Sequence, residues 1–478
     1  TRQNAKGFSL SKMQPAQPQQ RSADLPYKNR GDLTTGPVRD HLIRLTVPMI
    51  WGLFAVIFVQ LTDTYFVSLL GTRELAGISF TFPVIMTMTH VIFGLNIAMS
   101  SVIARLIGER RMEDAQRITL HGLLIAFILS VILAFLCGWF LDPIFTTLGA
   151  GPESMEVIRA YMPLWLVASV IISVPTNGNS ALRAAGDTLL PALIMTAIAS
   201  INLALNPALI FGWFGLPALG VTGSALSTLI AYCCGMGISL YVLIFKKNLI
   251  RLDHFHFEKL KDSLRRLMVI AIPAGITNTI MPLTNAFITA ILAVHGKEVV
   301  AAYGVTNRIE GLTMVFVLAL ALGMAPIVGQ NWGARIFARV HEAINLSIRF
   351  NFIWVFLIAL LLGIFAHPLA GLFSTDAIVT HYITLFFWIV PFSYAFGNLV
   401  FGWSSAFNAM GMPQRSFVMI VTKSILMTVP AVYIGHILGG PAGIFAALAF
   451  VNVTAGIGFH MLSWRACLAQ EHVLQPAE

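Results

Sequence analysis

The chain has 478 residues, of which 57% are hydrophobic and only 11% are charged. Soluble globular proteins carry about 25% charged residues because their surfaces face water, so that class is excluded. One crossing of a bilayer needs about 20 predominantly apolar residues, and this length allows about a dozen crossings. The net charge of +9 does not indicate a nucleic-acid partner, because the basic residues of a membrane protein fix its topology.

Residues 1–40 are polar and lack the hydrophobic region of a signal peptide, so we expect a flexible N-terminal tail. Apolar segments follow, separated by Gly, Pro and charged residues. Twelve of them are long enough to cross a bilayer with some tilt: 42–70, 76–103, 117–141, 157–182, 190–213, 219–245, 267–294, 299–328, 341–366, 380–408, 416–437 and 441–464. They are predicted to be helices, because segments of this length lack the alternation of barrel strands.

Basic residues are distributed unequally between the predicted loops. If the segment before residue 42 is cytoplasmic, the loops on that side contain fifteen of them: Arg105, Arg110, Arg111, Arg117, Arg183, Lys246, Lys247, Arg251, Lys259, Lys261, Arg265, Arg266, Arg335, Arg339 and Arg415. The opposite loops contain three basic residues, Arg73, Arg159 and Lys297, against six acidic ones. Because basic loops stay inside, we expect a multi-pass protein with both termini in the cytoplasm.

The two halves of the chain repeat at an offset of 225 residues. Three pairs share it: Pro48 and Pro273, Gly108 and Gly333, and the segments 180–186 and 405–411. Six spans per half make the repeats parallel, related by an axis along the membrane normal. We therefore predict an all-α integral membrane protein with an N-lobe at 41–245, a cytoplasmic linker at 246–266, a C-lobe at 267–465 and a C-terminal tail at 466–478. Such paired lobes carry solutes by rocking about a central cavity.

Motifs for other kinds of activity are missing from the sequence. There is no G-x-x-x-x-G-K-[ST] phosphate loop and no H-E-x-x-H zinc motif. The four cysteines have no C-x-x-C spacing, which favours small core residues over a metal or redox site. We therefore expect no enzyme, no cofactor and no metal, with an ion gradient as the source of energy.

Few polar or ionisable residues fall inside the predicted spans, where charge is costly. Asp63 lies 21 residues into the first span, Asn202 and Asn206 share one face of the fifth, and Thr228 lies about nine residues into the sixth. All four reach similar depth in the outer half of the membrane. Their oxygens can hold a proton or a hard cation. The alternative is a neutral Asp63 that only bonds its neighbours.

Pro48 lies on the same predicted helix as Asp63 and permits a bend, because proline removes a backbone hydrogen bond. We predict that protonation of Asp63 rearranges its hydrogen bonds to Asn202 and Asn206. The first helix then bends at Pro48 and cargo is released. The counterpart of Asp63 in the second half is Asn285, so coupling is expected in the first lobe alone.

The second half carries its own ionisable residues inside the spans. Arg308 and Glu310 lie in the eighth span and form either a buried polar network or part of a substrate site. Lys423 is expected to extend toward the cytoplasmic surface. For His90 and His121, packing is favoured over a proton relay.

Together these elements resemble the MATE (multidrug and toxic compound extrusion) family, in its bacterial DinF-like branch. The motifs that carry the resemblance are L-T-D-T at 61–64, A-L-R-A-A-G-D at 181–187, N-x-x-x-N-P at 202–207 and N-R-I-E at 307–310. It covers residues 40 to 465. It implies export of cationic and aromatic drugs in exchange for H⁺ or Na⁺ through a V-shaped pair of lobes. It further implies a monomer in the bacterial inner membrane, in contact with lipid and with no nucleic-acid partner.

The chain departs from the family pattern at Asn206, where related transporters often place a second Asp. A Na⁺ site here would have one carboxylate, whereas one carboxylate suffices for a proton, so H⁺ coupling is favoured over a Na⁺-coupled drug antiporter. A lipid-linked oligosaccharide flippase of the same superfamily is a further alternative. Its anionic cargo calls for several cavity cations, and the spans offer mainly Arg308 and Lys423. A channel-like or structural subunit would not need two repeated lobes with a buried acid.

Overall fold

The computed structural model describes residues 31–251, 253 and 256–474 of the chain. Helices dominate this part, and no strand occurs within it. The first half contains α1 (Val38–Ser68), α2 (Thr72–Gly108), α3 (Met112–Trp139), α4 (Leu141–Thr147), α5 (Pro152–Ala184), α6 (Leu189–Phe211), η1 (Trp213–Gly215), α7 (Val221–Tyr241) and η2 (Val242–Lys246). The second half contains η4 (Phe257–Lys259), α8 (Leu260–Ala293), α9 (Lys297–Gly333), α10 (Phe337–Ile364), α11 (Ala366–Phe373), α12 (Ala377–Ile389), η5 (Pro391–Ser393), α13 (Tyr394–Met410), α14 (Pro413–Val421), η6 (Thr422–Thr428) and α15 (Val429–Leu474).

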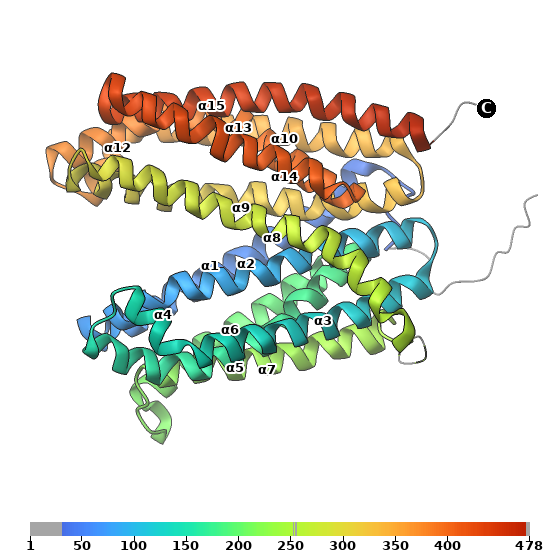
Figure 1. Cartoon of the computed structure of the whole chain (residues 1–478), viewed down its shortest axis with the longest axis horizontal. Helices are drawn as coiled ribbons and strands as arrows, with labels where there is room; N and C mark the ends of the chain where they lie inside the picture. The colour runs from blue at the N-terminus through green and yellow to red at the C-terminus, as the bar shows by residue number, and fades with distance from the viewer. Residues whose placement is uncertain (1–30, 252, 254–255, 475–478) are drawn as a thin grey trace, which may run out of the picture.

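The helices are arranged as two lobes, which lie one above the other in Figure 1. Eleven helical segments of the described chain are long and apolar enough to cross a membrane. The last one, Pro413–Leu474, has 62 residues, far more than one crossing needs. It breaks at Gly439 and Gly440, whose backbone angles are not helical. The break divides this segment into two crossings, so the predicted twelve-helix, two-lobe architecture is confirmed.

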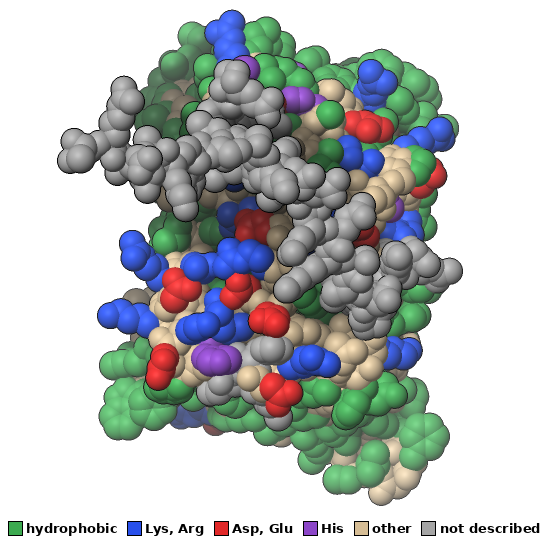
Figure 2. All heavy atoms as spheres, turned by 90° about the vertical axis from the view of Figure 1, so that its right-hand side faces the viewer, with side chains coloured by type: hydrophobic (Ala, Val, Ile, Leu, Met, Phe, Trp, Pro, Cys, Tyr) green, Lys and Arg blue, Asp and Glu red, His purple; other side chains and the backbone are tan. Residues whose placement is uncertain are grey.

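Both described ends of the chain lie at the same end of the molecule, on the right of Figure 1. Arg339, just after the turn between α9 and α10, donates to the Gly36 carbonyl at 2.6 Å, and Arg335 donates to the Leu474 carbonyl at 3.4 Å. We call this the terminal end and the opposite one the far end. Figure 2 shows the terminal end, where Lys, Arg, Asp and Glu side chains gather while the flanks are largely hydrophobic. This distribution fits a water-exposed cap on an apolar, membrane-embedded body.

Ordered structure extends beyond the predicted lobe boundaries in three places. Leu33, placed in the expected tail, is fully buried, and its N–H donates to the side-chain oxygen of Gln330 at 3.0 Å. Helix α8 begins at Leu260, inside the expected linker, and α15 continues to Leu474, inside the expected C-terminal tail. Polar composition pointed to loops at these places, but helix ends that face water are polar as well. Residues 1–30 and 475–478, the rest of the two expected tails, lie outside the described residues.

At the terminal end, each lobe contributes residues to the hydrophobic core of the other. The segment that leads into and begins α1 contributes four residues, Leu33, Val38, Leu42 and Leu45, to a hydrophobic core otherwise built from α8, α9, α10, α13, α14 and α15. Conversely, residues 267–271 of α8 belong to a core otherwise built mainly from α2, α3, α5, α6 and α7. Toward the far end each lobe has a core of its own. The lobes are therefore interlocked at one end and pack separately at the other.

A reciprocal crossing of α2 and α9 fastens the interlocked end. A Cβ added at Gly108 would overlap the backbone carbonyl of Gln330, and one added at Gly333 would overlap the carbonyl of Arg105. Gly108 and Gly333, like Arg105 and Gln330, are 225 residues apart. The repeat seen in the sequence is thus a structural twofold, and only glycine lets the two helix backbones approach this closely.

We predict that Gly108→Ala destabilises the protein by about 1–3 kcal/mol, because its methyl group forces the α2–α9 crossing apart. The measurement is thermal unfolding of the purified protein in detergent. Gly304→Ala in α9 is the matched control, since an added Cβ there meets no atom within 4 Å. Equal melting temperatures for the two variants would contradict the tight crossing.

Candidate functional site

The carboxylate of Asp63 lies on α1, toward the far end, facing α6 and α7. The Asn206 side-chain amide of α6 and the Ser224 hydroxyl of α7 each donate to the same carboxylate oxygen, Oδ1, at 2.7 Å. Asn206 and Ser224 are buried, while Asp63 is half-buried. The acid thus joins three helices of the N-lobe through two hydrogen bonds.

The hydrogen bonds continue from Asn206 along α6 and α7. Ser227 donates to the side-chain oxygen of Asn206 at 3.1 Å, and the Asn202 amide donates to the Ser227 hydroxyl at 3.3 Å and the Thr228 hydroxyl at 3.2 Å. The structure therefore brings the four predicted residues, Asp63, Asn202, Asn206 and Thr228, into one network. The side-chain oxygen of Asn202 is buried and has no hydrogen-bond partner among the described residues.

Three members of this environment were missed from the sequence. Ser224 and Ser227 lie three residues apart on α7, and Thr228 lies four residues after Ser224, so one helix face carries all three hydroxyls. That spacing was the signal available. Tyr161 of α5 is buried and lies within electrostatic range of Asp63. No sequence pattern marked Tyr161, because its place depends on how α5 packs against α2 and α7.

Pro48 lies inside α1, ten residues after its start at Val38. Proline has no N–H, so the carbonyl of Arg44 one turn earlier loses its helical partner. The hydroxyl of Thr188, at the start of α6, approaches that carbonyl at 3.4 Å. Fifteen residues, or about 22 Å along the helix, separate Pro48 from Asp63. A bend at Pro48 would therefore move the whole segment that carries the acid.

In the C-lobe, Glu310 and Arg308 point to different surroundings, as expected for positions two apart on a helix. Glu310 lies beside Tyr394 of α13 and within electrostatic range of Lys423, whereas Arg308 is exposed. Lys423 donates to the Gly397 carbonyl at 3.2 Å. The expectation that it extends to the cytoplasmic surface was wrong, because its ammonium group donates to a backbone carbonyl inside the lobe.

The backbone around Lys423 is itself irregular. Residues Thr422–Thr428 form a π-helical turn, η6, in which the hydroxyl of Thr428 donates to the carbonyl of Lys423 at 2.8 Å. Such turns are rare, occur often at functional sites and re-aim side chains relative to an α-helix. This one places Lys423 and Ser424 on the wall of a cavity of about 360 Å³.

A second cavity of about 360 Å³ lies between the lobes, lined by α2 and α5 on one side and by α8, α9, α13 and α14 on the other. The two cavities share Met281, Leu318, Phe401 and Ile420 in their walls, so they adjoin. Phe93 adds a second aromatic ring to the inter-lobe cavity. The combined space is mainly apolar in the middle and polar toward its edges.

Arg183 lines the inter-lobe cavity near the terminal end. Its side chain is buried and donates to the side-chain oxygen of Asn96 at 2.9 Å, and the Asn96 amide donates to the Thr176 carbonyl at 2.7 Å. The sequence interpretation of Arg183 as a loop residue that marks topology was wrong, because α5 continues through it to Ala184. No carboxylate lines either cavity in the described part of the chain.

The histidines expected to pack have different surroundings. His121 is fully buried, with its Nδ1 2.8 Å from the hydroxyl of Ser263. His90 is half-buried and lines the inter-lobe cavity beside Thr89. The counterpart of Asp63 in the C-lobe, Asn285, accepts a hydrogen bond from Tyr303 at 2.6 Å. The two lobes therefore share a scaffold but differ in polar chemistry.

Comparison with known proteins gives the same twofold division. The MatE family model matches twice, at residues 48–208 and 273–434, and the two matches begin 225 residues apart. The chain is 35% identical over 440 residues to a protein of Shewanella oneidensis named FAD transporter, covering 92% of this chain and 97% of that one.

Other relatives carry different names. The chain is 26% identical to the probable multidrug resistance protein YoeA of Bacillus subtilis, over 69% of this chain and 72% of that one. It is 22% identical to the multidrug export protein MepA of Staphylococcus aureus, over 86% and 90%. Among solved structures, it matches the Vibrio cholerae MATE transporter VcmN in the bent form with a TM-score of 0.86 and 28% identity, over 91% of this chain and 98% of that one.

Ser227→Ala is predicted to lower stability by about 1–3 kcal/mol, because it leaves the buried Asn202 amide and Asn206 oxygen each short of a partner. Ser68→Ala is the matched control, since the exposed Ser68 hydroxyl bonds the Tyr65 carbonyl of its own helix and nothing else in the part of the chain that the structure describes. The comparison is made by thermal unfolding in detergent. A loss no larger than that of the control would show that the network is not coupled as described.

Proposed function

The chain belongs to the MatE family of transporters, and from this premise we propose that it is a proton-coupled exporter working by alternating access. Its cargo occupies the adjoining cavities between and within the lobes. The interlocked terminal end and the separately packed far end support a state closed toward the terminal side. Rocking of the lobes about the α2–α9 crossing would close the far side and open the other.

We place the terminal end in the cytoplasm and the protein in the bacterial inner membrane. Basic residues at the far end are matched by acids: Arg73 pairs with Glu156, Arg159 pairs with Asp142 at 2.8 Å, and Lys297 lies 4.0 Å from Glu298. Hydrogen bonds from Arg159 hold the pKa of Asp142 below its usual range, so this pair persists into mildly acidic surroundings. The unbalanced positive charge is left at the terminal end, which supports its cytoplasmic placement.

The coupling step we propose is protonation of Asp63 from the outer side. A charged carboxylate makes stronger hydrogen bonds to Asn206 and Ser224 than a neutral acid does, because charge-assisted bonds are about twice as strong. Taking up a proton weakens both bonds and turns one carboxyl oxygen into a donor. Helix α1 is then free to change its packing on α6 and α7, bending at Pro48. Return of the proton to the cytoplasm restores the network.

Na⁺ remains the second candidate for the coupling ion, because one observation favours it. The unpartnered oxygen of Asn202 and the hydroxyl of Thr228 lie in the same network as the carboxylate of Asp63. Oxygens of this kind are ligands for hard cations. Asn206, however, presents its amide to Asp63, so the site has a single negative charge. A single carboxylate is enough to bind a proton, whereas Na⁺ needs several further ligands.

Asp63→Asn is predicted to abolish transport driven by a pH gradient, because the amide cannot exchange a proton, while the protein still inserts and folds. The assay is uptake of the transported cargo into inverted vesicles under separate pH and Na⁺ gradients. Thr64→Val is the matched control, since the exposed Thr64 hydroxyl bonds the Gln60 carbonyl of its own helix and no other group of the described residues. Full pH-driven activity of Asp63→Asn would refute Asp63 as the coupling group, and dependence of the wild type on Na⁺ alone would overturn proton coupling.

For the cargo, we propose an anionic aromatic molecule of the flavin dinucleotide class. Arg183 and Lys423 line the cavity walls among Asn, Ser and Thr side chains, and no carboxylate is among the described lining residues. Glu310, which lies within electrostatic range of Lys423, is not part of either wall. Flat rings suit Phe93 and Phe401, and a pyrophosphate suits the cations. The relative named FAD transporter, which aligns over nearly the whole chain, supports the same class.

Efflux of cationic aromatic drugs, the expectation drawn from the sequence, is the second candidate. The apolar middle of the cavity, with Met281 and Phe401 in both walls, suits flat hydrophobic molecules of either charge. The relatives YoeA and MepA carry multidrug names. A drug cation would have to tolerate Arg183 and Lys423 without a compensating acid in the wall, which makes this cargo class the weaker of the two.

Lys423→Met is predicted to weaken transport of flavin adenine dinucleotide about tenfold or more, since a hydrogen bond to a charged group contributes about 1.5–3 kcal/mol. Ethidium transport should be unchanged or faster. Lys423→Arg keeps the charge and is the matched control. Equal loss of both cargoes would indicate a structural role for Lys423, and ethidium transport without any flavin transport in the wild type would favour the drug-efflux alternative.

A further inference from the structure

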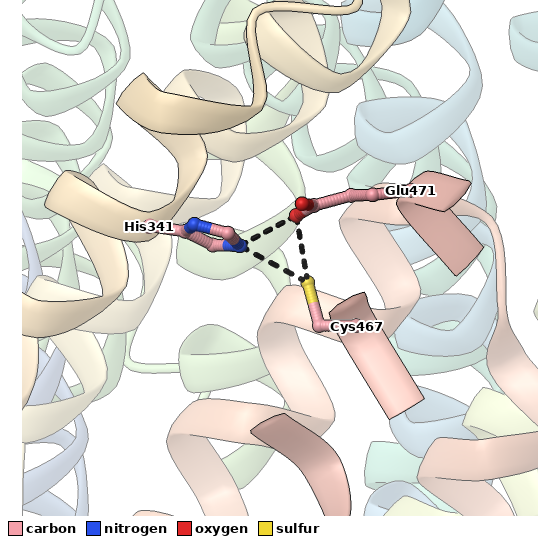
Figure 3. Close-up of side chains that lie close together, drawn as sticks. All are labelled: His341, Cys467 and Glu471. Carbon is pink, nitrogen blue, oxygen red and sulfur yellow. Dashed lines mark hydrogen bonds and ion pairs between the residues drawn. The ribbon is translucent and has the colours of Figure 1, made fainter. Parts of the chain in front are cut away.

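Three potential metal ligands converge at the terminal end of the C-lobe, away from both cavities. Figure 3 shows the side chains of His341, Cys467 and Glu471 pointing toward one another from two helices. His341 lies near the start of α10, and Cys467 and Glu471 lie four residues apart near the end of α15, which puts them on one helix face. One ligand atom from each lies within 4.8 Å of the other two.

The spacing of these atoms is close to that of a metal site. Nε2 of His341 lies 2.5 Å from Oε1 of Glu471, and the Cys467 sulfur lies 3.9 Å from that nitrogen and 3.7 Å from that oxygen. In a tetrahedral zinc site, metal–ligand bonds of about 2.0–2.3 Å put sulfur about 3.5 Å from nitrogen or oxygen ligands. They put nitrogen and oxygen about 3.3 Å apart. The two sulfur distances nearly fit, and the nitrogen–oxygen pair needs to open by less than one ångström when an ion replaces the hydrogen bond.

The surroundings fix the ligands and leave a route for an ion. Cys467 is fully buried, while the side chains of His341 and Glu471 are 22% and 14% exposed. The ring of Trp464 lies 5.0 Å from the His341 ring and restricts its rotation. Arg415 donates to the Ala466 carbonyl at 2.8 Å and so anchors the turn that carries Cys467.

We propose that His341, Cys467 and Glu471 bind one divalent transition-metal ion, with Zn²⁺ the best fit, and that the ion ties the end of α15 to α10. A thiolate, a carboxylate and a neutral imidazole are ligands that zinc prefers, and water completes the fourth position. The thiolate and the carboxylate together balance the charge of the ion. No spacing motif in the sequence marks this site, because His341 precedes Cys467 and Glu471 by more than 120 residues.

The test uses the full-length purified protein with Cys137, Cys233 and Cys234 replaced by Ser, so that Cys467 is the one remaining cysteine of the four. Co²⁺, a spectroscopic substitute for Zn²⁺, is added in detergent. The expected result is one Co²⁺ per chain, with a thiolate-to-cobalt charge-transfer band in the near ultraviolet that Zn²⁺ abolishes.

In the same background, Cys467→Ser should remove the band, and His341→Gln and Glu471→Gln should each weaken Co²⁺ binding at least tenfold. Size-exclusion chromatography checks that each variant is folded. The parent protein itself decides the matter if a variant fails to fold, because it keeps all three ligands. Absence of the band in the parent, or an unchanged affinity in both His341→Gln and Glu471→Gln, would overturn the proposal and leave His341 and Glu471 as a plain hydrogen-bonded pair.

Discussion

A carboxyl group inside a membrane must either accept hydrogen bonds or take up a proton. Asp63 accepts hydrogen bonds from neutral groups, which is compatible with either state. Two neutral donors, Asn206 and Ser224, share one of its oxygens at 2.7 Å, and no basic side chain forms an ion pair with it in the described part of the chain. A neutral network of this kind can exist in two protonation states at modest cost, whereas a fixed counter-ion would lock the charged one. In the proposed mechanism, the packing of α1 against α6 and α7 changes with the protonation state of Asp63.

Helix α1 connects the site of Asp63 to the other lobe. The start of α1 is packed in the core of the C-lobe, and its later part carries Asp63 in the N-lobe. Movement of α1 therefore acts across the lobe boundary. Pro48 lies between these two parts, where a missing backbone hydrogen bond lowers the cost of bending. The α2–α9 crossing, where Gly108 and Gly333 allow close backbone contact, is the pivot that we propose for the movement of the lobes.

Much of the fold could be predicted from the sequence because the bilayer imposes it. The lengths of the apolar segments predicted the twelve crossings, and the 225-residue repeat predicted the two lobes. The polar residues Asp63, Asn202, Asn206 and Thr228 could be grouped by depth alone, since depth follows from position along a helix. What depth cannot supply is the neighbour across a helix interface. Tyr161 was missed for that reason, and Lys423 and Arg183 were placed at the surface although they line cavities. Their burial depends on a π-helical turn and on a helix end that only tertiary packing fixes.

If Asp63 carries the exchanged ion, as we propose, binding of cargo displaces a proton from it, and this release can be measured. Purified protein in weakly buffered detergent is mixed with flavin adenine dinucleotide, and a pH indicator reports protons released. At a pH where Asp63 is protonated, the wild type is expected to release close to one proton per cargo molecule bound. Asp63→Asn that still binds cargo is expected to release none. Equal proton release by both proteins would contradict the proposal.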